Sequence, residues 1–182
     1  MKVDRSGRVE TIAPAAPNMV MSWLYIFSKR WNGSHNNAGD GGAIQLFRYQ
    51  PTDFHNGNWG AQQNWAYVNG AWTWTNSSTP PSIILQGDNI GEFSVKNIGG
   101  TYCMSYFDCS NYTISTRTAT RPDKVWSNPT AQISGLVVPH LYGGYIHPGS
   151  ASATSLTLIV SQWDGTIGDR PYWVLQFDGI NP

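Results

Sequence analysis

The acidic side chains of this sequence are few enough to be weighed one by one as possible proton donors. The chain has 182 residues, and 11 of them are Asp or Glu. Glu92 begins an apolar segment, residues 92–95, directly after a turn-forming segment at residues 87–91. Apolar contacts with Phe93 and Tyr102 would raise the pKa of this carboxyl group, as a general acid requires. We therefore predict Glu92 as a catalytic acid; the alternative is an exposed carboxylate in a turn.

Two aspartates in glycine-rich segments are candidates for a second catalytic carboxylate. Asp88 lies in the turn before Glu92, and Asp40 lies in the sequence Gly-Asp-Gly-Gly at residues 39–42. Bonding to their own backbone in turns is the alternative for both. We assign the other acids to turns or to the solvated surface: Asp4, Glu10, Asp53, Asp108, Asp123, Asp164, Asp169 and Asp178. Asp40 and Asp88 are thus the predicted partners of Glu92.

Residues 142–148, with the sequence YGGYIHP, form a second group of candidates. Tyr142, Tyr145 and His147 combine hydrogen-bonding groups with flat apolar faces, which suits a sugar ring with its hydroxyl groups and C–H faces. The two glycines between the tyrosines allow close approach of the backbone to a ligand, or a positive φ. We predict the three side chains as ligand-binding residues, and packing of buried aromatic rings is the alternative.

Trp163 and Arg117 complete the predicted binding residues. Trp163 follows the end of an apolar segment, where its ring could stack on a ligand. Arg117 and Arg48 lie within apolar segments, so each needs a carboxylate or carbonyl partner, and such a partner could be an acid of the site. By contrast, Trp65, Trp72 and Trp74 are predicted to form a cross-strand aromatic cluster in a hairpin rather than a sugar platform.

The sequence contains no motif that predicts a metal or an organic cofactor. Cys103 and Cys109 are too few for a structural zinc site, and two buried thiols are favoured over a disulfide bond. No His-x-x-x-His spacing, phosphate-binding loop or dinucleotide fingerprint occurs. We therefore expect neither a metal nor another cofactor.

Composition excludes several classes of partner. Lys and Arg also number 11, so the formal net charge is zero, and only 12% of the residues are charged. Binding of nucleic acid needs clustered cations, and none are present. No apolar stretch approaches the roughly 20 residues that span a membrane. The 13% of aromatic residues instead predicts a folded domain.

The elements that would position these residues are short strands separated by turns. They fall into three groups along the chain, at residues 22–75, 92–126 and 141–177. In the first group, Asn69-Gly70 predicts a type I′ hairpin between residues 64–68 and 71–75. The second group contains segments at 92–97, 101–107, 112–118 and 125–126, and the third contains 141–146, 155–163 and 173–177.

Repeated antiparallel groups of this kind predict an all-β fold of four-stranded propeller blades, with a β-sandwich as the alternative. We expect residues 1–21 to be an N-terminal extension and residues 22–182 to hold about three blades. Three blades cannot close a ring at this blade size, and they leave two open edges. A second copy of the chain or a missing N-terminal part is therefore the expected partner.

The second and third groups resemble the family called domain of unknown function 4185. The similarity extends over residues 22–178, and it is carried by residues 91–95, 102–106, 114–119, 126–127, 141–148 and 156–163. The resemblance implies a five-bladed propeller of actinobacteria or their phages, of which this chain matches the C-terminal blades. It also implies endo-D-arabinanase activity on cell-wall arabinan, and a location outside the cell or on a virion. No apolar signal core follows the basic residues near the N-terminus.

Two classes of function follow. The first is a glycoside hydrolase of the endo-D-arabinanase type, or a part of one, in which two carboxylates about 5 to 10 Å apart cleave the glycosidic bond. The second is a non-catalytic carbohydrate-binding or adhesive module, for example of a phage tail. A carboxylate near Glu92 would distinguish the two.

Overall fold

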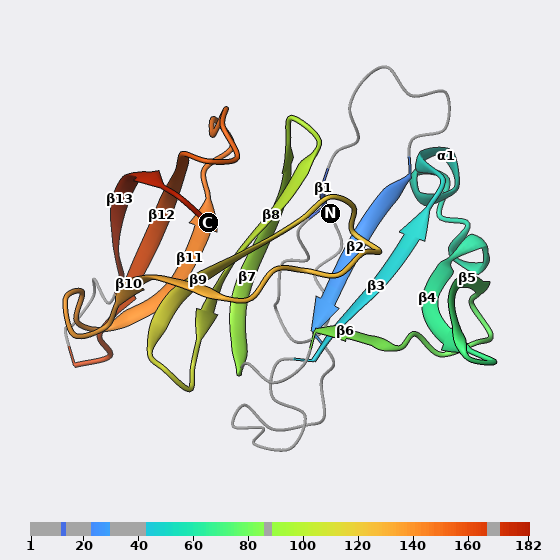
Figure 1. Ribbon diagram of the computed structural model, residues 1–182, viewed down its shortest axis with the longest axis horizontal. Coiled ribbons are helices and arrows are strands. Elements are labelled where there is room, and N and C mark those ends of the chain that lie inside the picture. Colours follow the sequence, from blue (N-terminus) through green and yellow to red (C-terminus); the bar gives the residue numbers. More distant parts are fainter. Residues whose placement is uncertain (1–11, 14–22, 30–42, 86–88, 167–171) are drawn as a thin grey trace. The chain divides into compact units, whose positions relative to one another are not determined.

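The computed structural model describes residues 12–13, 23–29, 43–85, 89–166 and 172–182 (Figure 1). Antiparallel strands make up nearly all of the regular structure in these ranges, and they form sheets of the kind found in propeller blades, which confirms the predicted fold class. The helical exceptions there are α1 (Pro51–His55) and one 3-10 turn, η1 (Trp59–Ala61). No helix in the described ranges has the length and apolar character to cross a membrane.

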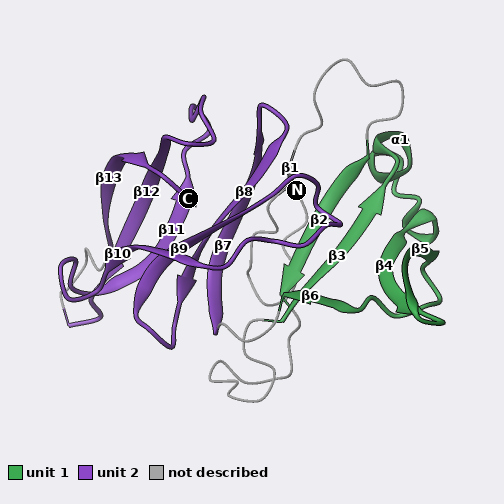
Figure 2. Cartoon of the chain, viewed as in Figure 1, with its two compact units in different colours: residues 1–86 green, residues 87–182 purple. Residues whose placement is uncertain are grey.

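The chain divides into two compact units, residues 1–86 and residues 87–182 (Figure 2). Unit 1 contains one sheet, with the strand order β1-β2-β3-β4-β5 and with β6 paired to β3. Its strands are β1 (Ile12–Ala13), β2 (Leu24–Lys29), β3 (Ile44–Tyr49), β4 (Gln63–Val68), β5 (Ala71–Asn76) and β6 (Ile83–Leu85). The sequence analysis missed β1 and β6, because strands of two or three residues are too short to show a period.

The hairpin between β4 and β5 forms as its turn residues predict. Asn69 has φ 52° and Gly70 has φ 82°, and two positive φ angles in succession are the signature of a type I′ turn. The register of the hairpin pairs Trp65 with Trp74 and Tyr67 with Trp72. The aromatic side chains of the hairpin therefore stand on one face of the sheet.

Unit 2 contains two antiparallel sheets. The first has the order β10-β9-β8-β7 and the second the order β11-β12-β13. The strands are β7 (Ile90–Ile98), β8 (Thr101–Asp108), β9 (Thr113–Ala119), β10 (Thr130–Ser134), β11 (Leu141–Ile146), β12 (Leu156–Trp163) and β13 (Tyr172–Ile180). Six of the predicted segments thus lie in strands of these two sheets, with boundaries shifted by up to three residues.

The predicted strand at residues 125–126 is wrong. The fourth strand of its sheet is β10, which begins after Pro129. Val125 and Trp126 have residue types that favour strands, but they lie in the connection from β9 to β10, where Val125 is 92% exposed and Trp126 is buried. Local β-propensity misled the prediction, because pairing with β9 falls to residues 130–134 instead.

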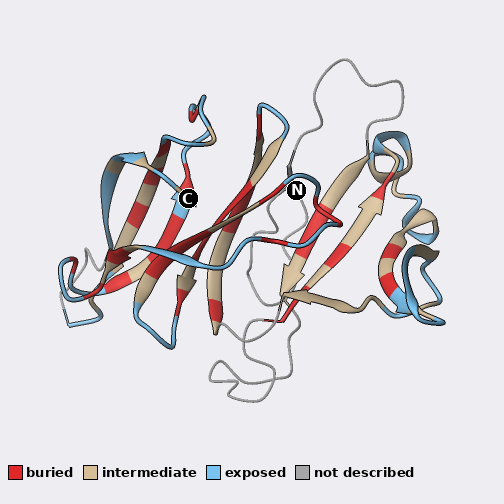
Figure 3. Ribbon diagram, viewed as in Figure 1, coloured by how far each residue is buried: buried red, intermediate tan, exposed pale blue. Residues whose placement is uncertain are grey.

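The core of unit 2 lies between its two sheets. Ile98, Cys103 and Ile114 of the first sheet belong to one buried cluster with residues of the second sheet, and Figure 3 shows the buried positions of β8, β9 and β12 in red. The residues from the second sheet are Leu141, Ile146, Leu156, Leu158 and Val160. β11 thereby lies against β7 and β8. The backbone N–H of Ile146 donates a hydrogen bond to Oγ of Ser94 at 2.8 Å, which ties β11 to β7.

Candidate functional site

Glu92 lies on β7 at an irregular part of the strand. The pairing of β7 with β8 shifts register between Ile90 and Phe93, which indicates a β-bulge. Bulges change the direction of a side chain, and they are frequent beside active sites. Space beside Gly91 is tight at this bulge, because a Cβ atom there would lie 3.1 Å from Sγ of Cys109. The bulge leaves the Glu92 side chain half-buried at the beginning of the strand.

The negative charge of Glu92 affects the pKa of Tyr145 on β11. Its pKa is raised to about 12, first because the ring is largely buried, and then because of the negative charge of Glu92 and the neighbouring Tyr142 and Tyr172. Even so, 38% of the Tyr145 surface remains exposed. The packing of β11 against β7 has therefore brought a predicted acid and a predicted binding residue, 53 positions apart in the chain, into one electrostatic environment.

Three further aromatic rings gather beside Tyr145. The ring of Tyr142 lies 5.9 Å from that of Tyr172, edge to face, and 6.4 Å from that of Trp163. Trp163 and Tyr172 are direct partners in the register of β12 and β13. Trp163 is 45% exposed and Tyr172 54% exposed, so both rings present surface to a ligand. We call Tyr142, Trp163 and Tyr172 the aromatic cluster.

Tyr172 is the residue that the sequence analysis missed. The last strand was predicted to begin at residue 173, which left Tyr172 in a loop, whereas β13 begins at Tyr172 itself. Its pairing with Trp163 was the available signal. If the antiparallel register of the two strands had been extended by one residue, it would have placed the two rings side by side.

The two glycines of residues 142–148 have packing roles on opposite faces of β11. A Cβ atom on Gly144 would lie 2.5 Å from Cγ2 of Ile114, so this glycine lets the two sheets of unit 2 approach each other. A Cβ atom on Gly143 would lie 3.2 Å from both Cε2 and Oη of Tyr145. The described glycines with positive φ are elsewhere, so a left-handed backbone is not the reason for this pair.

His147 occupies the end of β11 opposite to Tyr142. Its Nδ1 accepts a hydrogen bond from the backbone N–H of Gly149 at 2.9 Å. Hydrogen bonds from Thr157 and Gln176 lower the pKa of Asp178, and an electrostatic contribution from His147 acts in the same direction. These contacts place His147 among residues of a turn and of β13, and its predicted role in binding remains a prediction.

Arg117 serves the sheet in which it lies. Its Nη1 donates a hydrogen bond to the backbone carbonyl of Ser127, and its Nε lies 3.4 Å from Oη of Tyr106. The hydroxyl group of Ser127 in turn accepts a hydrogen bond from the N–H of Thr118. Arg117 thus anchors the connection from β9 to β10, and its predicted contact with a ligand remains a prediction.

Asp40 and Asp88 lie outside the described residues, and their role as partners of Glu92 remains a prediction. Other acids form turns, as expected. Asp108 ends β8 and accepts hydrogen bonds from the N–H groups of Ser110 and Asn111, and Asp164 accepts hydrogen bonds from Thr166. These two carboxylates are therefore engaged by their own turns.

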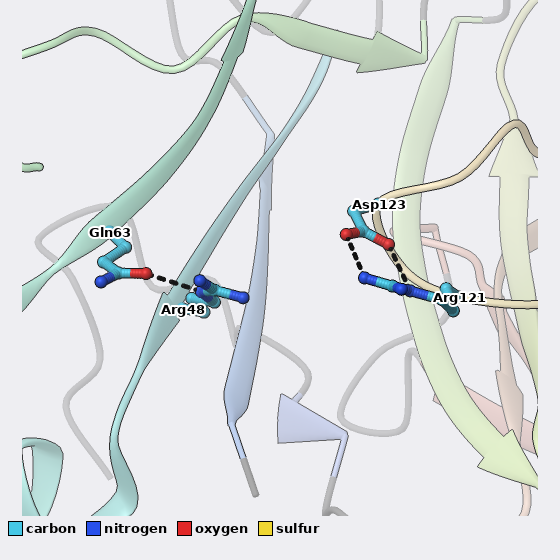
Figure 4. A network of polar contacts seen from close by, with 4 residues as sticks. All are labelled: Arg48, Gln63, Arg121 and Asp123. Atoms are coloured by element: carbon cyan, nitrogen blue, oxygen red, sulfur yellow. Dashed lines mark hydrogen bonds and ion pairs between the residues drawn. The ribbon is translucent and has the colours of Figure 1, made fainter. Parts of the chain in front are cut away.

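Asp123 lies in a turn, which is one of its two predicted positions, but it is buried rather than solvated. Its side chain is only 3% exposed and forms a two-pronged contact with Arg121, at 2.7 and 3.0 Å (Figure 4). The partner is local, because Arg121, whose side chain is 57% exposed, lies only two residues before Asp123. A buried carboxylate is tolerated when such a partner is present.

The two cysteines do not form a disulfide bond. Cys103 is buried, and burial raises its pKa to about 11. Cys109 is exposed, which corrects the expectation of two buried thiols, because it lies in the turn that follows β8. Within the described ranges, no three His, Cys, Asp or Glu side chains are grouped so as to hold a metal ion.

In unit 1, the tryptophans of the hairpin form the predicted cross-strand cluster. The ring of Trp65 lies 5.1 Å from that of Trp74 and 5.9 Å from that of Trp72. The guanidinium group of Arg48 lies between the rings of Trp23 and Trp74, at 3.9 and 4.0 Å from their centroids. Its Nε donates a hydrogen bond to Oε1 of Gln63 at 2.8 Å (Figure 4). Arg48 therefore contributes to the packing of this sheet face.

Comparison with known proteins gives three relatives of much greater length. An "Uncharacterized 35.9 kDa protein in asd 3'region" of Mycolicibacterium smegmatis is 28% identical over 91% of this chain and 50% of its own length. "Notoamide biosynthesis cluster protein J" of an Aspergillus species is 34% identical, over 79% of this chain and 37% of the relative. "Notoamide biosynthesis cluster protein J'" of Aspergillus versicolor is 38% identical, over 60% and 30%. The chain thus spans half or less of the length of these relatives.

A family model also matches this chain. The model of the domain of unknown function DUF4185 matches residues 5–178, which is nearly the whole chain. The match includes both units and every residue of the candidate site. It confirms the resemblance that the sequence indicated, and this chain belongs to the DUF4185 family.

Proposed function

We propose that this chain is part of a glycoside hydrolase of the endo-D-arabinanase type, with Glu92 as its general acid. The observation that carries the proposal is the position of Glu92. It is a half-buried carboxyl group on the strand that packs against β11, and it lies within electrostatic reach of Tyr145, which is itself within reach of Tyr142 and Tyr172 of the aromatic cluster. Carbohydrate recognition needs flat apolar surface together with donors and acceptors of hydrogen bonds, and this site offers both.

The proposed chemistry assigns separate roles to the acid and to the rings. The protonated carboxyl group of Glu92 donates a proton to the glycosidic oxygen as the bond to the leaving sugar breaks. The aromatic cluster holds a sugar ring by stacking, and Tyr145 donates a hydrogen bond to it. A second carboxylate must act as base or nucleophile, and Asp40 and Asp88 remain the candidates for that role.

Non-catalytic binding of a glycan is the second candidate function. It is favoured by the engagement of the described carboxylates Asp108 and Asp164 in their own turns, which leaves the second catalytic group to residues 40 or 88. The names of two relatives refer to a notoamide biosynthesis cluster, so a small aromatic molecule is a useful competing ligand in any binding test.

The test is to incubate the full chain and its Glu92→Gln variant with D-arabinan, and to measure both release of reducing ends and binding. Glutamine keeps the shape of the side chain but has no acidic proton to donate. We expect hydrolysis to fall by roughly 100-fold or more, as for loss of a general acid, while affinity stays within a few-fold. Asp178→Asn is the matched control, because it neutralises an exposed acid of β13 outside the proposed machinery.

The outcomes separate the two candidates. Hydrolysis that is undiminished in Glu92→Gln would rule out the acid role. Binding without hydrolysis by the unaltered chain would support the non-catalytic candidate. Preference for the small aromatic competitor over D-arabinan would contradict both.

A further inference from the structure

We propose that Gly143 is a positioning residue for Tyr145. The missing side chain at position 143 lets the Tyr145 ring lie along β11, and this holds the Tyr145 hydroxyl group over Gly143, where it is a hydrogen-bond donor to the glycan. The inference rests on the proposed function for its ligand.

Gly143 and Tyr145 belong to the same face of β11. They are two residues apart in the strand, whereas Gly144, between them, belongs to the other face. On β12, Gly143 is paired with Ser161 and Tyr145 with Ile159. The Tyr145 side chain therefore stands on the same face of the sheet as the position where a side chain of residue 143 would be.

The Tyr145 ring occupies the space beside Gly143. An added Cβ atom on Gly143 would lie 3.2 Å from both Cε2 and Oη of Tyr145, which is closer than Cβ atoms usually come to their neighbours. The contact with Oη shows that the outer end of the ring, not only its base, reaches back over Gly143. A side chain at position 143 therefore requires the Tyr145 ring to shift by at least a few tenths of an ångström.

The surroundings of the Tyr145 hydroxyl group suit a hydrogen-bond donor to a ligand. Tyr145 lies in the field of Glu92 and next to Tyr142 and Tyr172, and more than a third of its surface is exposed. Because its pKa is about 12, the phenol keeps its proton at all ordinary pH values, so it can donate a hydrogen bond wherever the protein is folded. Glu92 and Tyr145 can then contact neighbouring oxygen atoms of one sugar.

Comparison with Gly144 separates the proposed role of Gly143 from a role in sheet packing. The atoms that crowd position 144 belong to Ile114 in the other sheet, and the nearest lies 2.5 Å away. The atoms that crowd position 143 belong to a partly exposed side chain of the same strand and to Oγ of Ser161. Alanine at position 144 should thus weaken the fold, and alanine at position 143 should move Tyr145.

The test uses the full chain, labelled for NMR spectroscopy, with a D-arabinan oligosaccharide as the probe ligand. We expect a nuclear Overhauser effect between the ring protons of Tyr145 and Hα of Gly143. In Gly143→Ala the ring signals of Tyr145 should shift, and affinity should fall about three- to tenfold, the range for one lost hydrogen bond. Tyr145→Phe should lose a similar factor, and the double variant should bind no worse than Tyr145→Phe alone.

Gly144→Ala is the matched control, with a lower melting temperature but with the Overhauser effect between Tyr145 and Gly143 retained, because both residues lie on β11. Absence of the Overhauser effect, or unchanged ring signals and affinity in Gly143→Ala, would overturn the inference. So would a double variant whose loss equals the product of the single losses. If no glycan binds the unaltered chain, the proposed function fails, whereas the Overhauser effect and the ring shift still support the placement of Tyr145 by Gly143.

Discussion

At the scale of single residues, burial separates side chains that have identical chemistry. Cys103 is fully buried in the core of unit 2, and its pKa of about 11 leaves almost no thiolate at neutral pH. Cys109 lies only six positions away in an exposed turn. The same contrast applies to the acids, because Asp123 is buried with Arg121 while Asp178 is exposed.

The two thiols should therefore react at different rates. A thiol reagent at pH 8 should modify Cys109 in the folded chain within minutes, and Cys103 only as fast as the protein unfolds. Because the folded pKa of Cys103 exceeds its ordinary value of 9.0, the stability it contributes is complete below pH 9 and is lost as the pH rises through about 11. Mass spectrometry of the labelled peptides measures both rates, and equal rates at pH 8 would contradict the burial of Cys103.

At the scale of elements, the packing of two sheets in unit 2 depends on one residue without a side chain. Gly144 of β11 faces Ile114 of β9, and both are fully or nearly fully buried. Since Ile146 also bonds to Ser94 of β7, β11 is held against the first sheet at two positions. This contact is what brings Tyr145 to Glu92.

Gly144→Ala should destabilise the chain by about 1 to 3 kcal/mol, the usual cost of overpacking a core. Ile114→Ala removes the atoms that the new methyl group would meet, although by itself it should cost about 2 to 5 kcal/mol. The double variant should therefore be more stable than the sum of the two single effects predicts. Denaturant unfolding of the four proteins measures this coupling, and strict additivity would mean that the two residues do not contact each other.

At the scale of the whole molecule, the strand β13 presents apolar surface without cover in the described structure. Tyr172, Trp173, Val174 and Leu175 are consecutive and between 38% and 64% exposed. β13 is also the outermost strand of its three-stranded sheet. Exposed edge strands of this composition favour pairing with another chain. We therefore expect a second copy of the chain, or an N-terminal partner, to bind along β13.

We therefore expect the chain alone to self-associate. Light scattering should show a mass above 20.1 kDa that increases with concentration. Val174→Lys should shift the population toward the monomer, because lysine on an edge strand opposes pairing with a further strand. Thr154→Lys, which adds the same charge at an exposed position between β11 and β12, is the control. A strictly monomeric, well-folded chain at high concentration would contradict this prediction.

The sequence by itself determined the elements that depend on neighbouring residues. Alternating aromatic and β-branched segments predicted the longer strands, Asn69-Gly70 predicted its hairpin turn, and the family resemblance followed from strand-and-turn segments of the same kind. Each of these features is encoded within about ten consecutive residues. The short strands β1 and β6 and the true position of β10 escaped, because they depend on a distant strand that accepts their hydrogen bonds.

Only the tertiary structure decided which candidates lie near one another. It joined Glu92 to Tyr145, added Tyr172, and gave His147 and Arg117 contacts within their own turns and sheet. It also assigned the two adjacent glycines to different partners, one a ring of the same strand and the other Ile114 of the neighbouring sheet. These contacts cannot be predicted from the sequence alone, because they depend on the register between strands and on how closely two sheets approach. The register brings together Trp163 and Tyr172, nine positions apart, and the approach of the sheets brings together Ile114 and Gly144, 30 positions apart.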